Sequence, residues 1–252
     1  MNEASFELKA FGPITALCVM AAEPEYGPEL RARIKPLITG VGPVESAVET
    51  TAALALLAQQ DMLPDLVISL GSGGSQTLDH GRVYWIDEVA YRDMDATVLG
   101  FAPGVTPFLD LPAVLTLASG PQGQPYARLA TGASVVSGEA YDAIDADMVD
   151  METYAVVRAA ARFGLPVIGL RGVSDGKADL TVLEDWTGTL GVIDQGLADS
   201  FLETQLKPEL IEAAAARAGR KVTVRRQDGY DHSYFFIATF IGDHIAWHAG
   251  RL

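Results

Sequence analysis

Short apolar runs alternate with segments of helical spacing along most of the chain. The apolar runs are rich in β-branched and aromatic side chains and stop at glycine or proline, which predicts buried strands. They are residues 13–21, 36–42, 64–75, 82–93, 127–138 and 165–176. Residues 43–60 and 151–164 instead repeat alanine, leucine and valine every three or four positions, and residues 23–33 enter a helix with proline near its start. This alternation predicts an α/β protein with a mainly parallel, helix-covered sheet.

Two stretches depart from this pattern. The proline-rich residues 101–125 are predicted to form a loop. Beyond position 192 the charge balance changes, since residues 193–252 carry seven basic and eight acidic residues, whereas residues 1–192 carry eleven and twenty-five. We therefore expect two parts, a domain over 1–192 and a tail over 193–252. The tail has a helix–strand–helix pattern, and its start continues an apolar face through Trp186, Leu190, Ile193, Leu197 and Phe201.

Charge and composition exclude several partners. A net charge of −15 and a pI near 4.5 repel phosphate backbones and anionic membrane surfaces, so we expect no nucleic acid or membrane partner. No apolar run reaches the ~20 residues that a membrane helix requires. Cys18 is the one cysteine, and it lies in an apolar run, which indicates a small buried side chain in a reducing compartment. A cytoplasmic location is the expectation.

Four predicted strand or loop ends carry polar side chains that could meet at one edge of the sheet, where open α/β sheets bind ligands. They are Glu23 and Glu25; Ser72 with Gly71 and Gly73; Met151 and Glu152; and Arg171, Ser174 and Asp175. Each also has an ordinary structural explanation, because glycines make turns and acids stabilise helix N-termini. His80 is expected to be an inert loop residue. The coincidence of the four ends predicts a carboxylate-rich, metal-poor pocket.

Four segments together resemble the purine nucleoside phosphorylase superfamily, and most closely its 5′-methylthioadenosine/S-adenosylhomocysteine nucleosidase branch. These segments are ITGVGPVESAV, VISLGSGGS, VVSGEAYDAIDADMVDMETYAV and LPVIGLRGVSDG, within residues 13–192. The resemblance implies a three-layer α/β/α fold with a mixed central sheet. It also implies a homodimer that hydrolyses the N-glycosidic bond of 5′-methylthioadenosine and S-adenosylhomocysteine and releases adenine, without a metal or a cofactor.

The resemblance also implies roles for individual residues. Asp175 would be the general acid at N7 of the base, which requires a raised pKa at neutral pH. Glu152 would hold the ribose hydroxyls, and Glu25 would orient water. Asp147 and Asp150, which share the acidic segment with Glu152, are expected to be structural or peripheral.

Further positions would bind the substrate or support the acid. Tyr141 would stack on the base, Met151 would pack on the sugar, and Ser72 and Gly73 would line the ribose side. Ser174 and Arg171 would orient Asp175. Phe108 and Leu109, within the proline-rich loop, are candidates for the pocket at the 5′ end of the nucleoside. Many relatives have GSAGG where this chain has GSGGS, a small departure in this loop.

Water is a better nucleophile here than phosphate. Glu23 and Glu25 follow the first strand with no arginine before Arg31, so an anionic phosphate would be repelled. A related hydrolase or phosphorylase acting on another purine nucleoside is the alternative.

The tail resembles the C-terminal end of S-formylglutathione hydrolase, an esterase D type α/β-hydrolase. The resemblance places Asp199 and His232 at that family's catalytic aspartate and histidine. We expect residues 1–192 to lack the serine nucleophile, because their glycine–serine stretches belong to the nucleosidase pattern. The remnant is therefore expected to be inactive. A thioester hydrolase or a catalytically inactive chimera are the alternatives from other classes.

Overall fold

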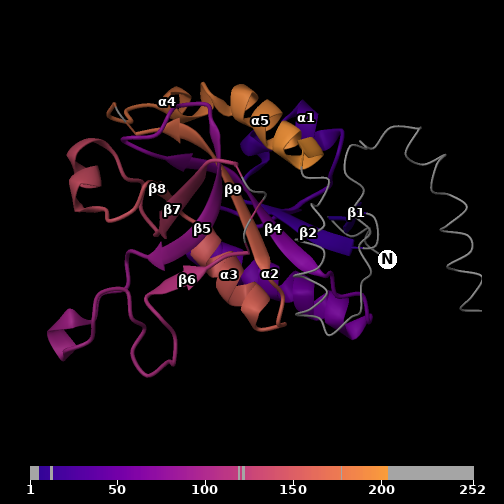
Figure 1. Ribbon diagram of the computed structural model, residues 1–252, viewed down its shortest axis with the longest axis horizontal. Coiled ribbons are helices and arrows are strands. Elements are labelled where there is room, and N and C mark those ends of the chain that lie inside the picture. Colours follow the sequence, from indigo (N-terminus) through magenta and orange to yellow (C-terminus); the bar gives the residue numbers. More distant parts are fainter. Residues whose placement is uncertain (1–5, 12–13, 119, 121–122, 177, 204–252) are drawn as a thin grey trace, which may run out of the picture.

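The computed structural model describes residues 6–11, 14–118, 120, 123–176 and 178–203 (Figure 1). The strands among them are β1 (Lys9–Phe11), β2 (Ile14–Met20), β3 (Leu37–Ile38), β4 (Leu66–Gly74), β5 (Val83–Tyr91), β6 (Val114–Thr116), β7 (Tyr126–Thr131), β8 (Met148–Asp150) and β9 (Val167–Asp175). The α-helices are α1 (Pro28–Arg31), α2 (Pro43–Gln59), α3 (Thr153–Ala161), α4 (Leu183–Thr187) and α5 (Leu190–Glu203). Three 3-10 helices, η1 (Glu23–Glu25), η2 (Thr97–Leu99) and η3 (Gly138–Ala143), complete the described elements. None of the described helices is long and apolar enough to cross a membrane.

The strands form one mixed sheet. β2, β4 and β9 are parallel neighbours, as are β5, β7 and β8. Antiparallel pairing of β5 with β9 and of β4 with β8 joins these two groups. The pairing therefore closes a ring, β4–β9–β5–β7–β8–β4, while β1, β2, β3 and β6 extend the sheet outside it.

Helices cover both faces of this sheet, with α1 and α5 on one side and α2 and α3 on the other (Figure 1). The side chains of β2 follow the two faces: Cys18 and Met20 join the core under α1 and α5, whereas Leu17 and Val19 join the core under α2 and α3. Both faces are buried, so the strand reads as a continuous apolar run rather than an alternating one. The predicted α/β class, its helix-covered mixed sheet and its layers are confirmed.

Some details differ from the sequence prediction. The glycine-rich end of the predicted strand 64–75, which was expected to run into a loop, stays in β4 and pairs with β9 up to Gly74. Residues 101–125, expected to be loop, contain β6, which pairs with β5. The short strands β1 and β8 were not predicted either. Three residues each in β1 and β6 provide too little periodicity to recognise.

Helix α5 runs through the predicted boundary at 192/193. Its residues Leu190, Ile193 and Leu197 are buried against the sheet, as the apolar spacing predicted. Asp194 is also buried and accepts hydrogen bonds from the backbone N–H groups of Glu29 (2.8 Å) and Leu30 (3.0 Å), so it stabilises the N-terminus of α1. The first turns of the predicted tail are thus part of the core. The domain boundary itself stays a prediction, and the tail elements predicted at 207–249 lie outside the described residues.

Candidate active site

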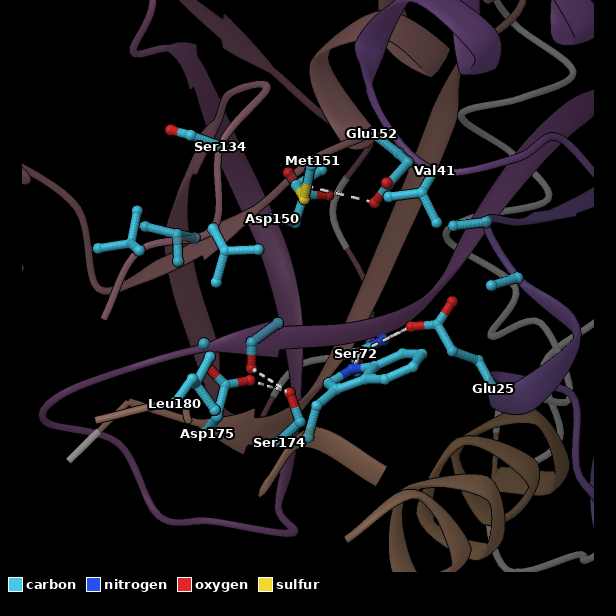
Figure 2. A pocket seen from close by; sticks show the side chains of 18 of the residues that line it. Glu25, Val41, Ser72, Ser134, Asp150, Met151, Glu152, Ser174, Asp175 and Leu180 are labelled. Carbon is cyan, nitrogen blue, oxygen red and sulfur yellow. Dashed lines mark hydrogen bonds between the residues drawn. The ribbon is translucent and has the colours of Figure 1, made fainter. Parts of the chain in front are cut away.

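A cavity of about 490 Å³ opens where β4 and β9 end, beside β8 and η1 (Figure 2). Its walls come from seven separate segments of the chain. The lining residues are Ala21, Ala22, Glu25, Val41, Ser72, Gly73, Gly74, Arg92, Ser134, Val135, Val136, Val149, Asp150, Met151, Glu152, Ser174, Asp175, Leu180, Thr181, Val182, Leu183 and Trp186. This is the volume and the largely apolar lining expected of a small-molecule site.

Glu25 lies at one end of the cavity, where η1 follows β2 (Figure 2). Its Oε1 accepts hydrogen bonds from the Ser72 backbone N–H (2.7 Å) and hydroxyl (2.6 Å). The Ser72 hydroxyl oxygen in turn accepts a bond from the indole N–H of Trp186 (2.9 Å). Glu25 Oε2 is buried and has no hydrogen-bond partner within the described part of the chain, which leaves an acceptor oxygen for a bound molecule.

Glu152 lies at the same end and directly precedes α3. Its carboxylate accepts hydrogen bonds from the backbone N–H groups of Gly42 (2.9 Å) and Met151 (3.3 Å). Burial, and secondarily the charge of Asp150, raises the pKa of Glu152 to about 7. A buried carboxylate with a hydrogen-bonded oxygen and an open face is suited to accept hydroxyl groups from a ligand.

Asp175 ends β9 at the opposite end of the cavity, near Leu180 (Figure 2). Burial raises its pKa, while a hydrogen bond from the Ser174 hydroxyl to Oδ1 (2.5 Å) opposes the shift. The walls here are apolar and include Val135, Val136 and Val149. Such an environment favours a protonated carboxyl that can donate to a ligand.

Asp150 and Arg171 form a buried pair behind the cavity. Arg171 Nη2 lies 3.0 Å from Asp150 Oδ2, and both side chains are at most 2% exposed. Arg171 also donates to Ser69 (3.0 Å) and Thr153 (2.7 Å), so it ties β4, β8, β9 and α3 together. Removing either partner would leave a buried charge, at a cost of roughly 3–5 kcal/mol. Of the acids in the 147–152 segment, Asp150 and Asp147 make structural contacts, since Asp147 accepts a bond from the Arg128 backbone N–H.

Most of the predicted site residues meet in this cavity. They are Glu25, Ser72, Gly73, Met151, Glu152, Ser174 and Asp175. Ser174 contacts Asp175 as predicted, but Arg171 does not, because its guanidinium is used by Asp150. Tyr141 does not line the cavity and packs instead against Ala130, Val136 and Val149.

Three other candidates lie elsewhere. Phe108 and Leu109 are 93% and 49% exposed and do not line the cavity. Asp199 is exposed on α5 and accepts a bond from Gln195, so it lies apart from the cavity as well. His232 lies outside the described residues.

One sequence expectation needs correction. Residues 172–176, GVSDG, do fit the letters of a G-x-S-x-G serine elbow. Ser174 lies within strand β9, however, and is 2% exposed, whereas an elbow serine stands exposed on the turn between a strand and a helix. Its hydroxyl donates to Asp175 and also approaches Gly73 O (3.3 Å). The motif is therefore present in sequence but not in its structural context.

Sequence reasoning missed two polar residues and one apolar wall. Trp186 was recognised only as part of an apolar face, although its indole N–H reaches Ser72. Arg92 lines the cavity and contacts Ser134 (3.2 Å), and its buried Nε has no hydrogen-bond partner among the described residues. The residues 180–183 follow an acidic turn with no periodic pattern, so no sequence signal indicated that they would cover the cavity.

Comparisons with solved structures find the same fold over about three quarters of the chain. A 5′-methylthioadenosine/S-adenosylhomocysteine nucleosidase from Neisseria meningitidis, in complex with methylthio-immucillin-A, has a TM-score of 0.59 at 22% identity, covering 75% of this chain and 98% of that one. A nucleosidase of the same name from Colwellia psychrerythraea, with adenine bound, has a TM-score of 0.60 at 21% identity, covering 80% and 97%. Futalosine hydrolase of Helicobacter pylori has a TM-score of 0.63 at 18% identity, covering 76% and 96%. At these identities the likeness establishes the fold.

Comparison with curated proteins finds a different similarity. S-formylglutathione hydrolase of Paracoccus denitrificans is 50% identical over 76 residues, which are 29% of this chain and 27% of that protein. The chain thus spans about a quarter of the length of this relative, and the match accords with the predicted esterase-like tail.

The model of the phosphorylase superfamily matches residues 35–190, which hold most of the cavity residues. With more than half of its length matched, the chain belongs to the phosphorylase superfamily.

Proposed function

We propose that the protein hydrolyses the N-glycosidic bond of 5′-methylthioadenosine and S-adenosylhomocysteine and releases adenine. The observation that supports this most is the meeting of Glu25, Glu152 and Asp175 in one cavity, each in a different environment. Cleavage of this bond develops positive charge on the sugar and negative charge on the departing base. It therefore calls for carboxylates at the sugar and for an acid at the base.

Asp175 is the proposed acid. Its raised pKa and apolar surroundings favour the protonated form, and its position opposite the two glutamates suits a purine lying between Val135, Val136 and Leu180. The proton leaves Asp175 Oδ and forms a bond to N7 of the base as the glycosidic bond breaks. General acid catalysis of this kind contributes about 10²–10⁴-fold in rate.

Glu152 and Glu25 act at the sugar. Glu152 accepts the ribose hydroxyls with the carboxylate face that its backbone hydrogen bonds leave open, and Met151 packs on the ring. Glu25 keeps one oxygen on Ser72 and uses the unpartnered Oε2 to orient the attacking water. Both carboxylates also stabilise the cationic sugar in the transition state.

Water is favoured over phosphate by charge. Arg92 is the cationic side chain among the described residues that line the cavity, and it contacts Ser134, which lies far from Glu25 in Figure 2. A phosphate ion placed between Glu25 and Glu152 would meet two carboxylates without a compensating cation. Futalosine is the second candidate substrate, supported by the fold likeness to futalosine hydrolase.

The test is base release measured by chromatography, with and without phosphate, from 5′-methylthioadenosine, S-adenosylhomocysteine and futalosine. Adenine release at a rate independent of phosphate is expected. A strict phosphate requirement would refute the hydrolase, and release from futalosine alone would reassign the substrate.

No esterase activity is proposed for the tail. Asp199 is exposed and contacts Gln195, and Ser174 is buried in the nucleoside cavity. An aspartate and a histidine without an activated serine form no acyl-enzyme. Hydrolysis of a p-nitrophenyl ester above the rate of the Ser174→Ala variant would contradict this.

A further inference from the structure

The hydroxyl of Tyr141 is a buried polar atom without a function in the mechanism above. The residue is 7% exposed and packs in an apolar cluster with Ala130, Val136 and Val149. Among the residues that the structure describes, its hydroxyl has no hydrogen-bond partner. Burying an unpaired hydroxyl costs roughly 1–3 kcal/mol, so a partner in another state of the protein is to be expected.

The position of Gly74 identifies that partner. A Cβ atom built on Gly74 would lie 2.1 Å from Tyr141 Oη and 2.9 Å from Asp175 Oδ2. Both oxygens thus point into the space that the missing side chain leaves free. Ser174 bonds the other carboxyl oxygen, Oδ1, so the two hydroxyls serve different oxygens of one acid.

We propose that the Tyr141 hydroxyl is a positioning group for Asp175, donating a hydrogen bond to Oδ2 once the acid has given its proton to the departing base. The inference rests on the proposed function, because it assumes that Asp175 ionises during the reaction. It differs from the role implied by the sequence resemblance, in which the Tyr141 ring stacks on the base.

The proton balance is simple. The O–H bond of Asp175 breaks as the N–H bond to the base forms, while Tyr141 keeps its own proton throughout. Burial, and secondarily the charge of Asp175, raises the pKa of Tyr141, so the phenol remains a neutral donor. Its hydrogen bond stabilises the carboxylate product of the proton transfer, a role that phenylalanine cannot fill.

Other charged groups also affect the pKa values of Asp175 and Tyr141. The exposed His80 lowers the pKa of Asp175, and Arg92 lowers that of Tyr141. Glu25 and Glu152 share the cavity at its other end. None of these groups changes when the Tyr141 hydroxyl alone is removed, so a Tyr141→Phe variant isolates its effect.

The test compares the pH dependence of kcat/KM in the wild type, Tyr141→Phe and Tyr154→Phe. Tyr154 is an equally buried tyrosine, 7% exposed, that stacks on Tyr91 and does not line the cavity. In Tyr141→Phe the maximum should fall about tenfold through kcat, since a hydrogen bond to a charged group contributes roughly 1.5–3 kcal/mol. Because the loss of a donor destabilises the carboxylate, the pKa of Asp175 should rise and the alkaline limb should move about one pH unit higher. Tyr154→Phe should match the wild type.

Superimposable pH profiles for the wild type and Tyr141→Phe would overturn the inference. A loss confined to KM would also do so, since it would assign the hydroxyl to the base. His80→Asn, measured in parallel, gives the size of a shift due to an exposed charge alone.

A second readout does not need turnover. Carboxyl carbon NMR of aspartate-labelled protein, with Asp175 assigned through Asp175→Asn, should give a higher pKa for Asp175 in Tyr141→Phe than in the wild type. If the wild type releases no base from any nucleoside, the proposed function fails, yet this titration still decides whether the hydroxyl bonds the carboxylate. An unchanged titration excludes the bond.

Discussion

The two ends of the cavity treat their carboxyl groups differently. At the end of Glu25 and Glu152, backbone N–H groups donate to the carboxylates, from Ser72 to the first and from Gly42 and Met151 to the second. At the end of Asp175, valine and leucine side chains form the wall, and a neighbouring serine hydroxyl supplies the hydrogen bond. Dipoles that point at an acid favour its anion, and apolar walls favour its neutral form.

This difference teaches how one site can hold acids for opposite tasks. The chemistry proposed here needs anions at the sugar and a proton donor at the base. The two ends do not separate anionic from protonated acids completely. Burial and the charge of Asp150 raise the pKa of Glu152 to about 7 despite two backbone donors. A bound ribose would add hydroxyl donors and favour the anion further.

Asp175→Asn, at the end of the cavity proposed to hold the base, should cause the largest loss of activity. An amide of the same shape cannot give up a proton, so kcat should fall about 10³-fold, within the range for loss of a general acid. The measurement is base release at saturating substrate, with folding checked by circular dichroism. Asp142→Asn, an exposed acid on η3, is the control and should stay within twofold. Near wild-type turnover in Asp175→Asn would remove the proposed acid.

Glu25→Gln should break the water-orienting role at the other end. The Gln carbonyl can still accept the Ser72 bonds, but the amide nitrogen replaces the acceptor Oε2, so kcat should fall about 10²-fold with little change in KM. Glu23→Gln is a matched control, since Glu23 belongs to the same η1 but is exposed and paired with Arg31. Equal losses in both variants would contradict a specific role for Glu25.

Glu152→Gln should show that the buried carboxylate of Glu152 lowers the free energy of unfolding at neutral pH. A carboxyl whose pKa rises from 4.5 to about 7 on folding stabilises the protein fully below pH 4.5 and loses that contribution as the pH rises through about 7. Between pH 4.5 and 8 the wild type without ligand should therefore lose on the order of 3 kcal/mol more unfolding free energy than Glu152→Gln does. Denaturant unfolding at several pH values measures this, with the exposed Glu49→Gln as the control. Parallel pH dependence in all three proteins would exclude a raised pKa for Glu152.

Trp186→Phe should have the smallest effect. It removes the indole N–H bond to Ser72 and keeps most of the apolar contact, so kcat should fall roughly two- to tenfold. If the indole acts through Ser72, the double variant with Ser72→Ala should lose less than the product of the two single losses. If the loss in the double variant equals the product of the two single losses, Trp186 acts independently of Ser72 and Glu25.

Sequence could predict the described strands other than β1, β6 and β8, and their alternation with helices, because most of these strands are buried on both faces. Continuous apolar runs such as residues 13–21 and 165–176, bounded by glycine or proline, identify them without any structure. The closed ring could not be predicted. It depends on the antiparallel pairing of β5 with β9 and on one register pair between Gly74 and Val149, and neither leaves a pattern along the chain.

The site was predictable to the extent that its residues sit at strand ends. Glu25, Ser72, Glu152 and Asp175 follow or end strands, so sheet topology brings them together. Arg171 was assigned to the wrong acid because, within a strand, one position decides which side a side chain faces. The wall at 134–136 was predicted as the end of a strand, but β7 stops at Thr131, and the wall at 180–183 had no pattern, so only the structure places both.

The ring of strands also limits how a ligand can enter. Ser72, Val149 and Ser174 belong to paired strands of that ring, so these walls cannot separate without breaking the sheet. Segments 134–136 and 180–183 have no strand pairing, and beside them the Leu180 N–H bonds the Ser137 hydroxyl (2.8 Å). These two segments can therefore move without breaking strand pairing, as can other lining residues outside strands, among them Ala21, Ala22, Val41 and Arg92. Substitutions in the two segments should change access to the cavity while leaving the three acids in place.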